Sequence, residues 1–453
     1  MRAPANAEIF ENLSPGKAVL TLAIPTIIAQ LITVLYSVAD IFYVGQLGDP
    51  EQVAGVRLAF PPFLFLTGIA NLFGIGAASA IGRALGVRNF EKARGCAAFA
   101  FWGGCAIALA YAAAVWISRG TLLPFLGTRE GNYGYTACYL FWTVLAGSVP
   151  MVASTILSHL LRSEGHAKVA GRGLAIGGVA NILIAPVFIF LLGLEIRGAA
   201  IAVLISNIIS LAYLYFSSRR LGSRTVVNIL PAAAQSGSKY AGEILSVGIA
   251  SFVMLTMATV SNAALNMLAA GYGSEAVAGL GIAKQIDQLV FSCSIGLAQG
   301  ALPLIAYNFS SGNHERLRKV VRSALLGGIA FSSAATVLLI IFSYPVTRAF
   351  IAEEATASYA SIFVRLIALA CPLSIIGQLC VAGFQGCGAK WRPLIIAFLR
   401  KGTLDTPFMI LFSYLFGVFG IALAVPVSEF IASAMALALF LPFLRSLSGK
   451  AKE

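Results

Sequence analysis

Apolar residues along the chain gather into twelve long runs that are separated by short polar segments. The runs lie near residues 18–44, 53–80, 96–117, 134–160, 173–194 and 198–217, and then near 243–270, 276–308, 320–345, 357–385, 394–415 and 418–445. About 20 apolar residues are enough for a helix to cross the hydrocarbon core of a bilayer. The pattern therefore predicts an all-α polytopic membrane protein with twelve transmembrane helices.

The polar segment between the sixth and seventh runs divides the chain into halves. We expect an N-terminal lobe over residues 18–217 and a C-terminal lobe over 243–445, each with six helices, joined by a linker over 218–242. Residues 1–17 and 446–453 are short polar ends. Because twelve is an even number of crossings, both ends are expected on the same side of the membrane.

The basic residues indicate which side that is. The linker and the loops near 83–94, 162–172, 316–322 and 390–392 contain 17 Lys and Arg residues, whereas the opposite side of the protein contains 5. Short loops rich in Lys and Arg stay in the cytoplasm. We therefore expect both termini and the linker to be cytoplasmic.

The composition narrows the function classes. With 59% hydrophobic residues, 11% charged residues and a mean hydropathy of +0.88, the chain has no room for a large soluble domain. Its net charge of +13 is spread over many loops, so we expect the lipid bilayer, and no nucleic acid, as a partner. The seven cysteines include no CxxC pair, and we expect no metal site.

The two halves of the sequence echo each other. Three segments recur in the same order at an offset of 224 residues: VAG at 53–55 and 277–279, GA at 76–77 and 300–301, and NFEK at 89–92 with NHER at 313–316. A repeat of six helices with like orientation predicts two lobes related by a pseudo-two-fold axis along the membrane normal. Two such lobes suit a transporter that opens its centre to either side in turn.

One carboxylate, Asp40, lies in the later half of the first run. A charged aspartate costs roughly 2.5–3.5 kcal/mol at the centre of a transmembrane helix. The dipole of the helix also disfavours negative charge near its C-terminal end. A residue that is kept despite both costs is a candidate functional group, and we predict that Asp40 is a protonatable site in a transporter.

Four stretches resemble the multidrug and toxic compound extrusion (MATE) transporters, and they look closest to the DinF-like branch. They are IPTIIAQLITVLYSVADIFYVGQLG at 24–48, VAGVRLAFPPFLFLTGIANLFGIGAASAIGRALG at 53–86, LLRSEGHAK at 160–168 and LAQGALPLIAYNFSSGN at 297–313. The resemblance covers about residues 16 to 445. It implies a V-shaped, two-lobed antiporter of the bacterial cytoplasmic (inner) membrane. Such a protein expels cationic or amphipathic drugs and metabolites in exchange for protons or sodium.

The resemblance also implies roles for individual residues. Asp40 matches a first-helix carboxylate that couples ion movement to transport, and Pro25 matches a proline associated with bending of that helix. Tyr36 lies one turn before Asp40, within reach of a hydrogen bond. Asn181 matches the asparagine of a fifth-helix N-x-x-x-D-P pattern.

Two of the oxygen ligands usual in the family are missing here. The aspartate of the fifth-helix pattern is replaced by Ala185, and a sixth-helix threonine is replaced by Val203. A sodium ion needs several oxygen ligands, whereas a proton needs only one carboxylate. We therefore favour coupling to a proton gradient over sodium, and we expect no other cofactor.

Further polar residues within the predicted helices leave alternatives open. Lys284 and Asp287 share a face of the eighth helix, where they are either a mutually neutralising pair or an ion or substrate site of the C-terminal lobe. Asp405, with Arg400 and Lys401, favours a structural pairing. Side chains of these kinds more often pack between helices, but four are candidates for the substrate cavity: Asn262, Met254, Met257 and Gln299.

Competing functions are distinguished by what they require. A sodium-coupled exporter of the same family and a lipid-precursor flippase of the same superfamily both stay open, although a flippase needs several basic residues in its cavity. An enzyme is not expected, because HExxH motifs and phosphate-binding Gly-x-x-x-x-Gly-Lys-Ser/Thr loops are absent from the sequence. The identity of the substrate is not encoded in these patterns, and we expect a monomer.

Overall fold

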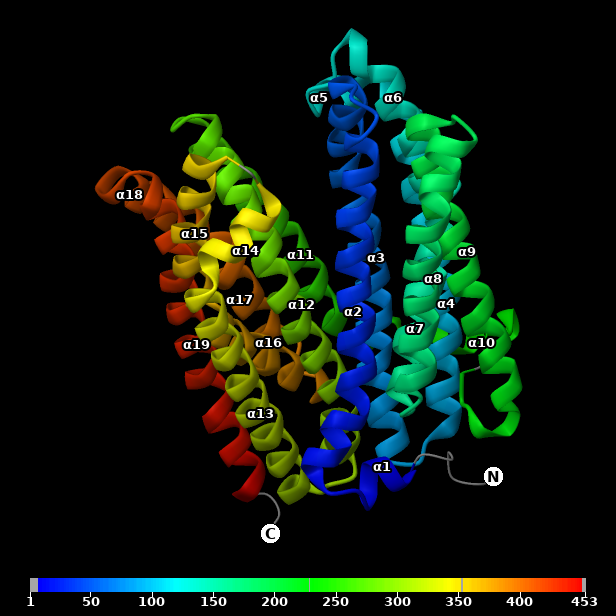
Figure 1. Ribbon diagram of the computed structural model, residues 1–453. Helices are drawn as coiled ribbons and strands as arrows, with labels where there is room; N and C mark the ends of the chain where they lie inside the picture. Colours follow the sequence, from blue (N-terminus) through cyan, green and yellow to red (C-terminus); the bar gives the residue numbers. More distant parts are fainter. Residues whose placement is uncertain (1–6, 228, 352, 450–453) are drawn as a thin grey trace. The chain divides into compact units, whose positions relative to one another are not determined.

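The computed structural model describes residues 7–227, 229–351 and 353–449, and within these ranges the chain is helical and contains no β-strand. The all-α prediction is confirmed. The chain divides into two compact units (Figure 1). The N-unit comprises Ile28–Phe252 with residues 7–12, and the C-unit comprises Leu13–Ile27 with the chain from Val253 onward.

The N-unit is built mainly from the helices drawn in blue to green in Figure 1. These are α1 (Ala7–Glu11), most of α2 (Pro15–Gly45), α3 (Pro50–Gly86), α4 (Phe90–Ile117), α5 (Arg119–Phe125), α6 (Glu130–Leu140) with the π-helical η1 (Phe141–Leu145), α7 (Ser148–Ser163), α8 (Ala167–Pro186) with the π-helical η2 (Val187–Leu191), α9 (Glu195–Leu221), the 3₁₀ turns η3 (Gly222–Arg224) and η4 (Ser238–Tyr240), and α10 (Pro231–Gly237).

The C-unit repeats this plan with the later helices. They are most of α11 (Ala241–Ala270), α12 (Ser274–Ser310), α13 (His314–Ile341), α14 (Ser343–Phe350), α15 (Glu354–Ala368), α16 (Cys371–Gly386), α17 (Trp391–Phe398), the π-helical η5 (Leu399–Leu404), α18 (Asp405–Phe416) and α19 (Val418–Gly449). Each unit thus has one bent pair at the position of its fourth span, α6–α7 and α15–α16, with bends of 44° and 42°.

Eleven of the twelve predicted spans are recognisable by length and composition in the described part of the chain. Nine are single apolar helices, and the two bent pairs add two more. The twelfth, predicted near 394–415, is the continuous stretch α17–η5–α18. It contains Arg400, Lys401 and Asp405, and these charges are the reason that composition alone does not mark it as a span.

Two helices, α2 and α11, are each shared between the units. The predicted lobes began at residues 18 and 243 and kept each helix whole, whereas the compact units divide α2 after Ile27 and α11 after Phe252. The first part of α11 packs in the N-unit, where a Cβ on Gly76 would lie 2.1 Å from the carbonyl oxygen of Ile244. Only glycine allows such an approach.

The first part of α2 makes the equivalent contact in the C-unit. A Cβ on Gly300 would lie 2.6 Å from the Cα of Ala23. Gly300 is the repeat counterpart of Gly76, so the recurring GA segment has a structural explanation. Both glycines allow a close helix contact. Gly76 on α3 leaves room for the first part of α11, and Gly300 on α12 leaves room for the first part of α2.

The recurring NFEK and NHER segments are helix N-caps. Asn89 Oδ1 accepts a hydrogen bond of 2.9 Å from the backbone N–H of Lys92 at the start of α4. Asn313 Oδ1 accepts one of 3.0 Å from the N–H of Arg316 at the start of α13. An asparagine at this position satisfies a backbone donor that the first turn leaves unpaired.

The segment predicted as a linker, 218–242, is largely ordered in the N-unit. α9 extends to Leu221, and α10 packs against α4, where a Cβ on Gly237 would lie 2.0 Å from the carbonyl oxygen of Gly95. The indole N–H of Trp102 also donates to the carbonyl of Ile229 at 2.8 Å. The polar composition did not predict α10, because the contacts that hold this helix are made with α4, more than 100 residues earlier in the chain.

Candidate functional site

Asp40 lies on α2 in the N-unit, and its side chain is 6% exposed. Its Oδ1 atom is buried and has no hydrogen-bond partner among the described residues. Nor does Asp40 belong to any of the ion pairs formed within residues 7–449. A buried acceptor without a partner costs about 1–3 kcal/mol. The site is therefore poised to take a proton, a cation or a water molecule.

α8 lies directly against α2 at this level. A Cβ on Gly178 would lie 2.5 Å from Ile32 Cγ2 and 3.3 Å from Tyr36 Cδ1. One to two turns further along both helices, the Tyr43 hydroxyl donates to the carbonyl of Ile182 at 3.3 Å. The two contacts show that α2 and α8 run side by side in the same direction. The absence of a side chain at Gly178 allows them to approach.

Asn181 lies on α8 between these two contacts and therefore near the level of Asp40. It is 1% exposed, and neither its Oδ1 nor its Nδ2 has a hydrogen-bond partner in the described chain. The structure thus brings Tyr36, Asp40 and Asn181 to one region of the α2–α8 contact. This region contains several buried polar atoms that have no hydrogen-bond partner among the described residues, which is uncommon for a buried site.

Tyr139 on α6 completes this group and was missed by the sequence reasoning. It is 9% exposed, and its hydroxyl interacts electrostatically with both Asp40 and Tyr36. A tyrosine inside an apolar run gives no signal of its own, because such residues commonly pack. Its proximity to Asp40 depends on how α6 packs in the N-unit, and that packing leaves no mark in the local sequence pattern.

The two positions where the family pattern has oxygen ligands are apolar in the structure as well. Ala185 is completely buried and Val203 is 5% exposed. Their side chains contribute methyl groups to the N-unit and no lone pairs. At these two positions the N-unit therefore offers no side-chain oxygen to an ion.

Pro25 lies inside α2, which continues as a helix on both sides of it. Proline lacks the N–H that would bond to the carbonyl four residues earlier, so the helix is weakened there. The boundary between the two compact units follows closely, between Ile27 and Ile28. Bending at Pro25 remains a prediction, and the structure places this proline beside the point where α2 passes from one unit to the other.

The predicted pair on α12 forms in the C-unit. Lys284 Nζ lies 3.1 Å from Asp287 Oδ2, and the two side chains are 27% and 18% exposed. This ion pair is compatible with both interpretations of these residues, so their functional role stays a prediction.

The four cavity candidates also belong to the C-unit. Asn262 is exposed, whereas Met254, Met257 and Gln299 are half-buried. Met257 packs against the π-helical segment, since a Cβ on Gly402 would lie 3.0 Å from its Sδ atom. This contact supports packing as one role of Met257, and the cavity assignment of the four stays a prediction.

A buried cluster of four charges lies deeper in the C-unit. Arg400 Nε donates to Glu429 Oε2 at 2.7 Å, and Lys401 Nζ lies 3.0 Å from both Glu429 Oε1 and Asp405 Oδ2. Ser261 on α11 donates to the same Asp405 oxygen at 3.0 Å. Arg400 and Glu429 are 0% and 1% exposed. The expected pairing of Asp405 with Lys401 is present.

Glu429 was not singled out from the sequence, although a carboxylate within a predicted span is itself a signal. It neutralises Arg400, which the sequence reasoning had grouped with Asp405. Two positive and two negative charges balance within the cluster. It is therefore a compensated network, and each of its carboxylates has a cation within 3.0 Å.

Another buried carboxylate, Glu164, lies outside the spans at the end of α7. It accepts hydrogen bonds of 3.0 Å from the Thr225 hydroxyl and from the backbone N–H of Val226, and so holds the segment after α9. Burial raises the pKa of the Glu164 carboxyl to about 7, while these hydrogen bonds lower it. Glu164 therefore holds the segment after α9 to the end of α7 by hydrogen bonds, and it titrates near neutral pH.

Comparisons with known proteins agree with the repeat and the fold. The MatE family model matches residues 25–187 and again 250–411, which are corresponding parts of the two halves. The chain is 28% identical to proteins named "Multidrug export protein MepA" from Staphylococcus saprophyticus and Staphylococcus aureus, over 94% of this chain and 94% of theirs.

A solved structure described as "Crystal structure of MATE in complex with MaL6" is similar along its whole length. It has a TM-score of 0.92 at 24% sequence identity and covers 98% of this chain and 99% of that chain. At this level of identity the likeness shows the fold, and it agrees with the predicted fold class of twelve helices in two six-helix halves.

Proposed function

We propose, because this chain belongs to the MatE family, that it is a secondary antiporter that exports cationic or amphipathic organic compounds in exchange for protons. The relatives named as multidrug export proteins support export of drugs, and the cationic or amphipathic nature of the compounds is part of the proposal. They are export proteins rather than enzymes, in agreement with the expectation from the sequence.

Asp40 is the proposed coupling residue, and one observation carries the assignment. Among the carboxylates in the spans discussed above, it is the one that is buried with an unpartnered oxygen and no ion-pair partner. A compensated carboxylate, such as Glu429, has little reason to change its charge during transport. Asp40 changes its hydrogen bonds and its charge when it gains or loses one proton, and this is the elementary event that an antiporter needs.

The surrounding residues support a proton cycle. When Asp40 is ionised, the hydroxyls of Tyr36 and Tyr139 and the amide N–H₂ of Asn181 are the donors available to it. When it is protonated, the amide oxygen of Asn181 is an available acceptor. We propose that this exchange shifts α2, with Pro25 as the weak point of the helix, and so alternates access between the two sides of the membrane.

The same residues offer fewer oxygen ligands than a sodium ion needs, whereas a proton needs only the carboxylate. Ala185 and Val203 supply no oxygen, which leaves one carboxylate with neutral ligands. A proton that crosses a membrane potential of 100 mV releases about 2.3 kcal/mol, to which a pH gradient adds.

A lipid-precursor flippase is not favoured. Among the basic residues in the spans, Lys284 is a candidate for binding the pyrophosphate of such a substrate, but its charge is compensated by Asp287 at 3.1 Å. We further propose that the protein works as a monomer in the bacterial cytoplasmic membrane, with both termini in the cytoplasm.

The test is efflux of a fluorescent cationic dye from proteoliposomes, with proton and sodium gradients imposed separately. We expect a proton gradient alone to drive export by the unmodified protein, and Asp40→Asn to reduce export to the level of empty liposomes. Asp287→Asn is the matched comparison, because it removes the half-buried candidate carboxylate of the C-unit. Export driven by sodium alone, or full activity of Asp40→Asn, would refute the proposal.

A further inference from the structure

The start of α11 is held in the N-unit by a group of charges. Lys92 Nζ lies 2.6 Å from Glu243 Oε2, and Arg83 Nη2 donates to Glu243 Oε1 at 2.7 Å. Lys92 Nζ also lies 5.2 Å from the centre of the Tyr240 ring. Glu243 is in the first turn of α11, whereas its two cations lie in the last turn of α3 and the first turn of α4. One carboxylate therefore joins three helices of the N-unit.

These three charges are partly withdrawn from water. The side chains of Arg83, Lys92 and Glu243 are 12%, 24% and 29% exposed. In contrast, the pair of Lys319 with Glu315 on α13 is 63% and 75% exposed. Water and salt screen an exposed pair, so that it contributes at most about 1 kcal/mol. The contacts of Glu243 are therefore better placed than an ordinary surface ion pair to hold a helix.

Close backbone packing continues the contact along α11. A Cβ on Gly76 of α3 would lie 2.1 Å from the carbonyl oxygen of Ile244, and a Cβ on Gly248 of α11 would lie 1.8 Å from that of Leu72. Helices that approach so closely lose many favourable atom contacts when they separate. The first part of α11 is thus tied to α3 by its backbone as well as by its charge.

The C-unit holds the start of α2 with the repeat counterpart of Lys92. Arg316 lies 224 residues later, and its Nη2 donates to the carbonyl of Leu13, just before α2. Each of these basic residues is the third residue of its helix, α4 or α13. Further along α2, a Cβ on Gly296 would lie 2.7 Å from the Cα of Ile27, the last residue of α2 in the C-unit. The two halves therefore hold each other's leading helix at equivalent positions.

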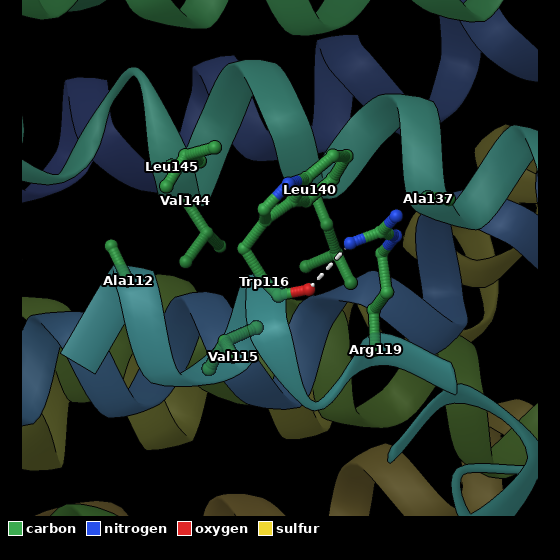
Figure 2. A pocket seen from close by; sticks show the side chains of 8 residues that line it. All are labelled: Ala112, Val115, Trp116, Arg119, Ala137, Leu140, Val144 and Leu145. Carbon is green, nitrogen blue, oxygen red and sulfur yellow. Dashed lines mark hydrogen bonds between the residues drawn. The ribbon is translucent and has the colours of Figure 1, made fainter. Parts of the chain in front are cut away.

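The helix that carries Lys92 is itself fixed in the N-unit at its other end. There Ala112 and Val115 pack against Leu140 and Val144 of the α6–η1 segment (Figure 2). Three of these side chains are at most 2% exposed. Because α4 is held in the N-unit along its length, a contact with its first turn attaches α11 to the N-unit as a whole.

We propose that Arg83, Lys92 and Glu243 form an anchor that stays closed throughout transport, so that the first part of α11 moves with the N-unit. Arg316 gives the first part of α2 the matching anchor in the C-unit. Bending of α2 and α11 is then confined to the stretches around the boundaries between the units, and Pro25 lies beside one of them. This inference rests on the proposed transport cycle but does not depend on the coupling ion.

A reversible cross-link tests whether the anchor stays closed. Lys92→Cys and Glu243→Cys are combined, and the two thiols are joined by a short bis-methanethiosulfonate, whose disulfide bonds a reductant cleaves. Dye efflux from proteoliposomes is driven by whichever gradient drives the unmodified protein. We expect the linked protein to export dye at the rate of the unmodified protein, and export to slow once the link is cleaved. Unmodified protein treated with the same reagent controls for the native cysteines, six of which are buried.

Hydrogen exchange tests the anchor without relying on transport. Glu243→Gln is expected to speed amide exchange in the first part of α11 about tenfold, because hydrogen bonds between charged groups are lost. The first part of α2 should be unchanged in this variant. Arg316→Gln is the reciprocal control, with faster exchange expected in the first part of α2 and none of the change in α11.

Two results would overturn the assignment. Export that is blocked by the cross-link and restored by the reductant would show that the contact must open in each cycle. Unchanged exchange in the first part of α11 of Glu243→Gln would show that the ion pairs do not hold this helix. An unmodified protein that exports no dye would count against the proposed function instead, and hydrogen exchange would still decide whether the anchor exists.

Discussion

The polar centres of the two units differ although the units share a duplicated scaffold. In the N-unit, Asp40 is buried with an unpartnered oxygen and without an ion-pair partner. In the C-unit, Asp405 and Glu429 are each 1% exposed. Asp405 Oδ1 also has no hydrogen-bond partner in the described chain, but each of these carboxylates has a cation within 3.0 Å. A buried carboxylate with a cation is held in its charged state, whereas one without a cation gains from taking a proton. The duplication kept the scaffold in both halves, and in the proposed mechanism charge exchange takes place in the first half alone.

Removing one member of the C-unit cluster has the largest expected effect on stability. Glu429→Gln leaves Arg400 buried without its carboxylate and should lower the free energy of unfolding by about 3–5 kcal/mol. Thermal unfolding in detergent measures this loss. The double variant Arg400→Met with Glu429→Leu should recover much of it, because it removes both charges together.

At Asp40, in contrast, we expect a substitution to abolish transport without lowering stability. Asp40→Asn removes a costly buried charge and should leave the melting temperature unchanged or raise it, while transport is lost. Comparable losses of stability at both sites would mean that Asp40 has a partner as strong as Arg400, and the contrast between the units would fail.

The shared scaffold can be tested at the two matched glycines. Gly76→Ala and Gly300→Ala each force a Cβ against the backbone of the crossing helix, at 2.1 and 2.6 Å. Overpacking of this kind costs about 1–3 kcal/mol. We expect similar decreases in melting temperature for the two variants. Gly281→Ala, a position with nothing within 4 Å of the added Cβ, is the control and should not be destabilised.

Tyr139→Phe sharpens the account of the N-unit site. It removes a hydroxyl that interacts with Asp40. In the proposed cycle this hydroxyl is a donor available to the ionised carboxylate, so its loss should make the proton harder to remove. The pH at which dye efflux is half-maximal should then rise by about 0.5–1 unit. Tyr111→Phe, whose hydroxyl donates to the Pro62 carbonyl at 3.1 Å, is the matched control. An equal shift in both variants would remove Tyr139 from the site.

The smallest expected effect distinguishes the end of α7 in the N-unit from the corresponding end of α16 in the C-unit. The pKa of Glu164 is raised to about 7 from an ordinary value of 4.5. The folded protein therefore holds this proton more tightly than the unfolded chain. Its contribution to stability is complete below about pH 4.5 and is lost as the pH rises through about 7. Glu164→Gln should flatten this part of the dependence of melting temperature on pH.

The corresponding end of α16 has no carboxylate to titrate. There Cys387 precedes Gly388 (φ 75°), as Glu164 precedes Gly165 (φ 89°) at the end of α7. A variant at Cys387, such as Cys387→Ser, should therefore leave the slope between pH 4.5 and 7 intact. If the melting temperature of Glu164→Gln still depends on pH between 4.5 and 7 as it does in the unmodified protein, another group causes that dependence.

Much of the fold could be predicted because the relevant signals are local. Apolar runs mark the spans, and the recurring Asn89 and Asn313 mark helix starts. The cost of a charge in the bilayer drew attention to Asp40. The span α17–η5–α18 was also recognisable, although Arg400 and Asp405 interrupt its apolar pattern, because the runs on either side of them are long.

What escaped prediction depends on contacts between distant segments. Tyr139 approaches Asp40 from a helix about 100 residues later, and Glu429 reaches Arg400 from α19. The division of α2 and α11 between the units and the packing of α10 against α4 have the same origin. Burial and partner choice arise from packing, and no single stretch of sequence displays them.

Proton release on substrate binding tests the central claim most directly. A cationic substrate is added to the purified protein in weakly buffered solution with a pH indicator, and the protons released per bound substrate are counted. We predict about one proton for the unmodified protein and for Asp287→Asn, and none for Asp40→Asn, each with substrate binding measured in parallel. Release of the same number of protons by Asp40→Asn would contradict the account.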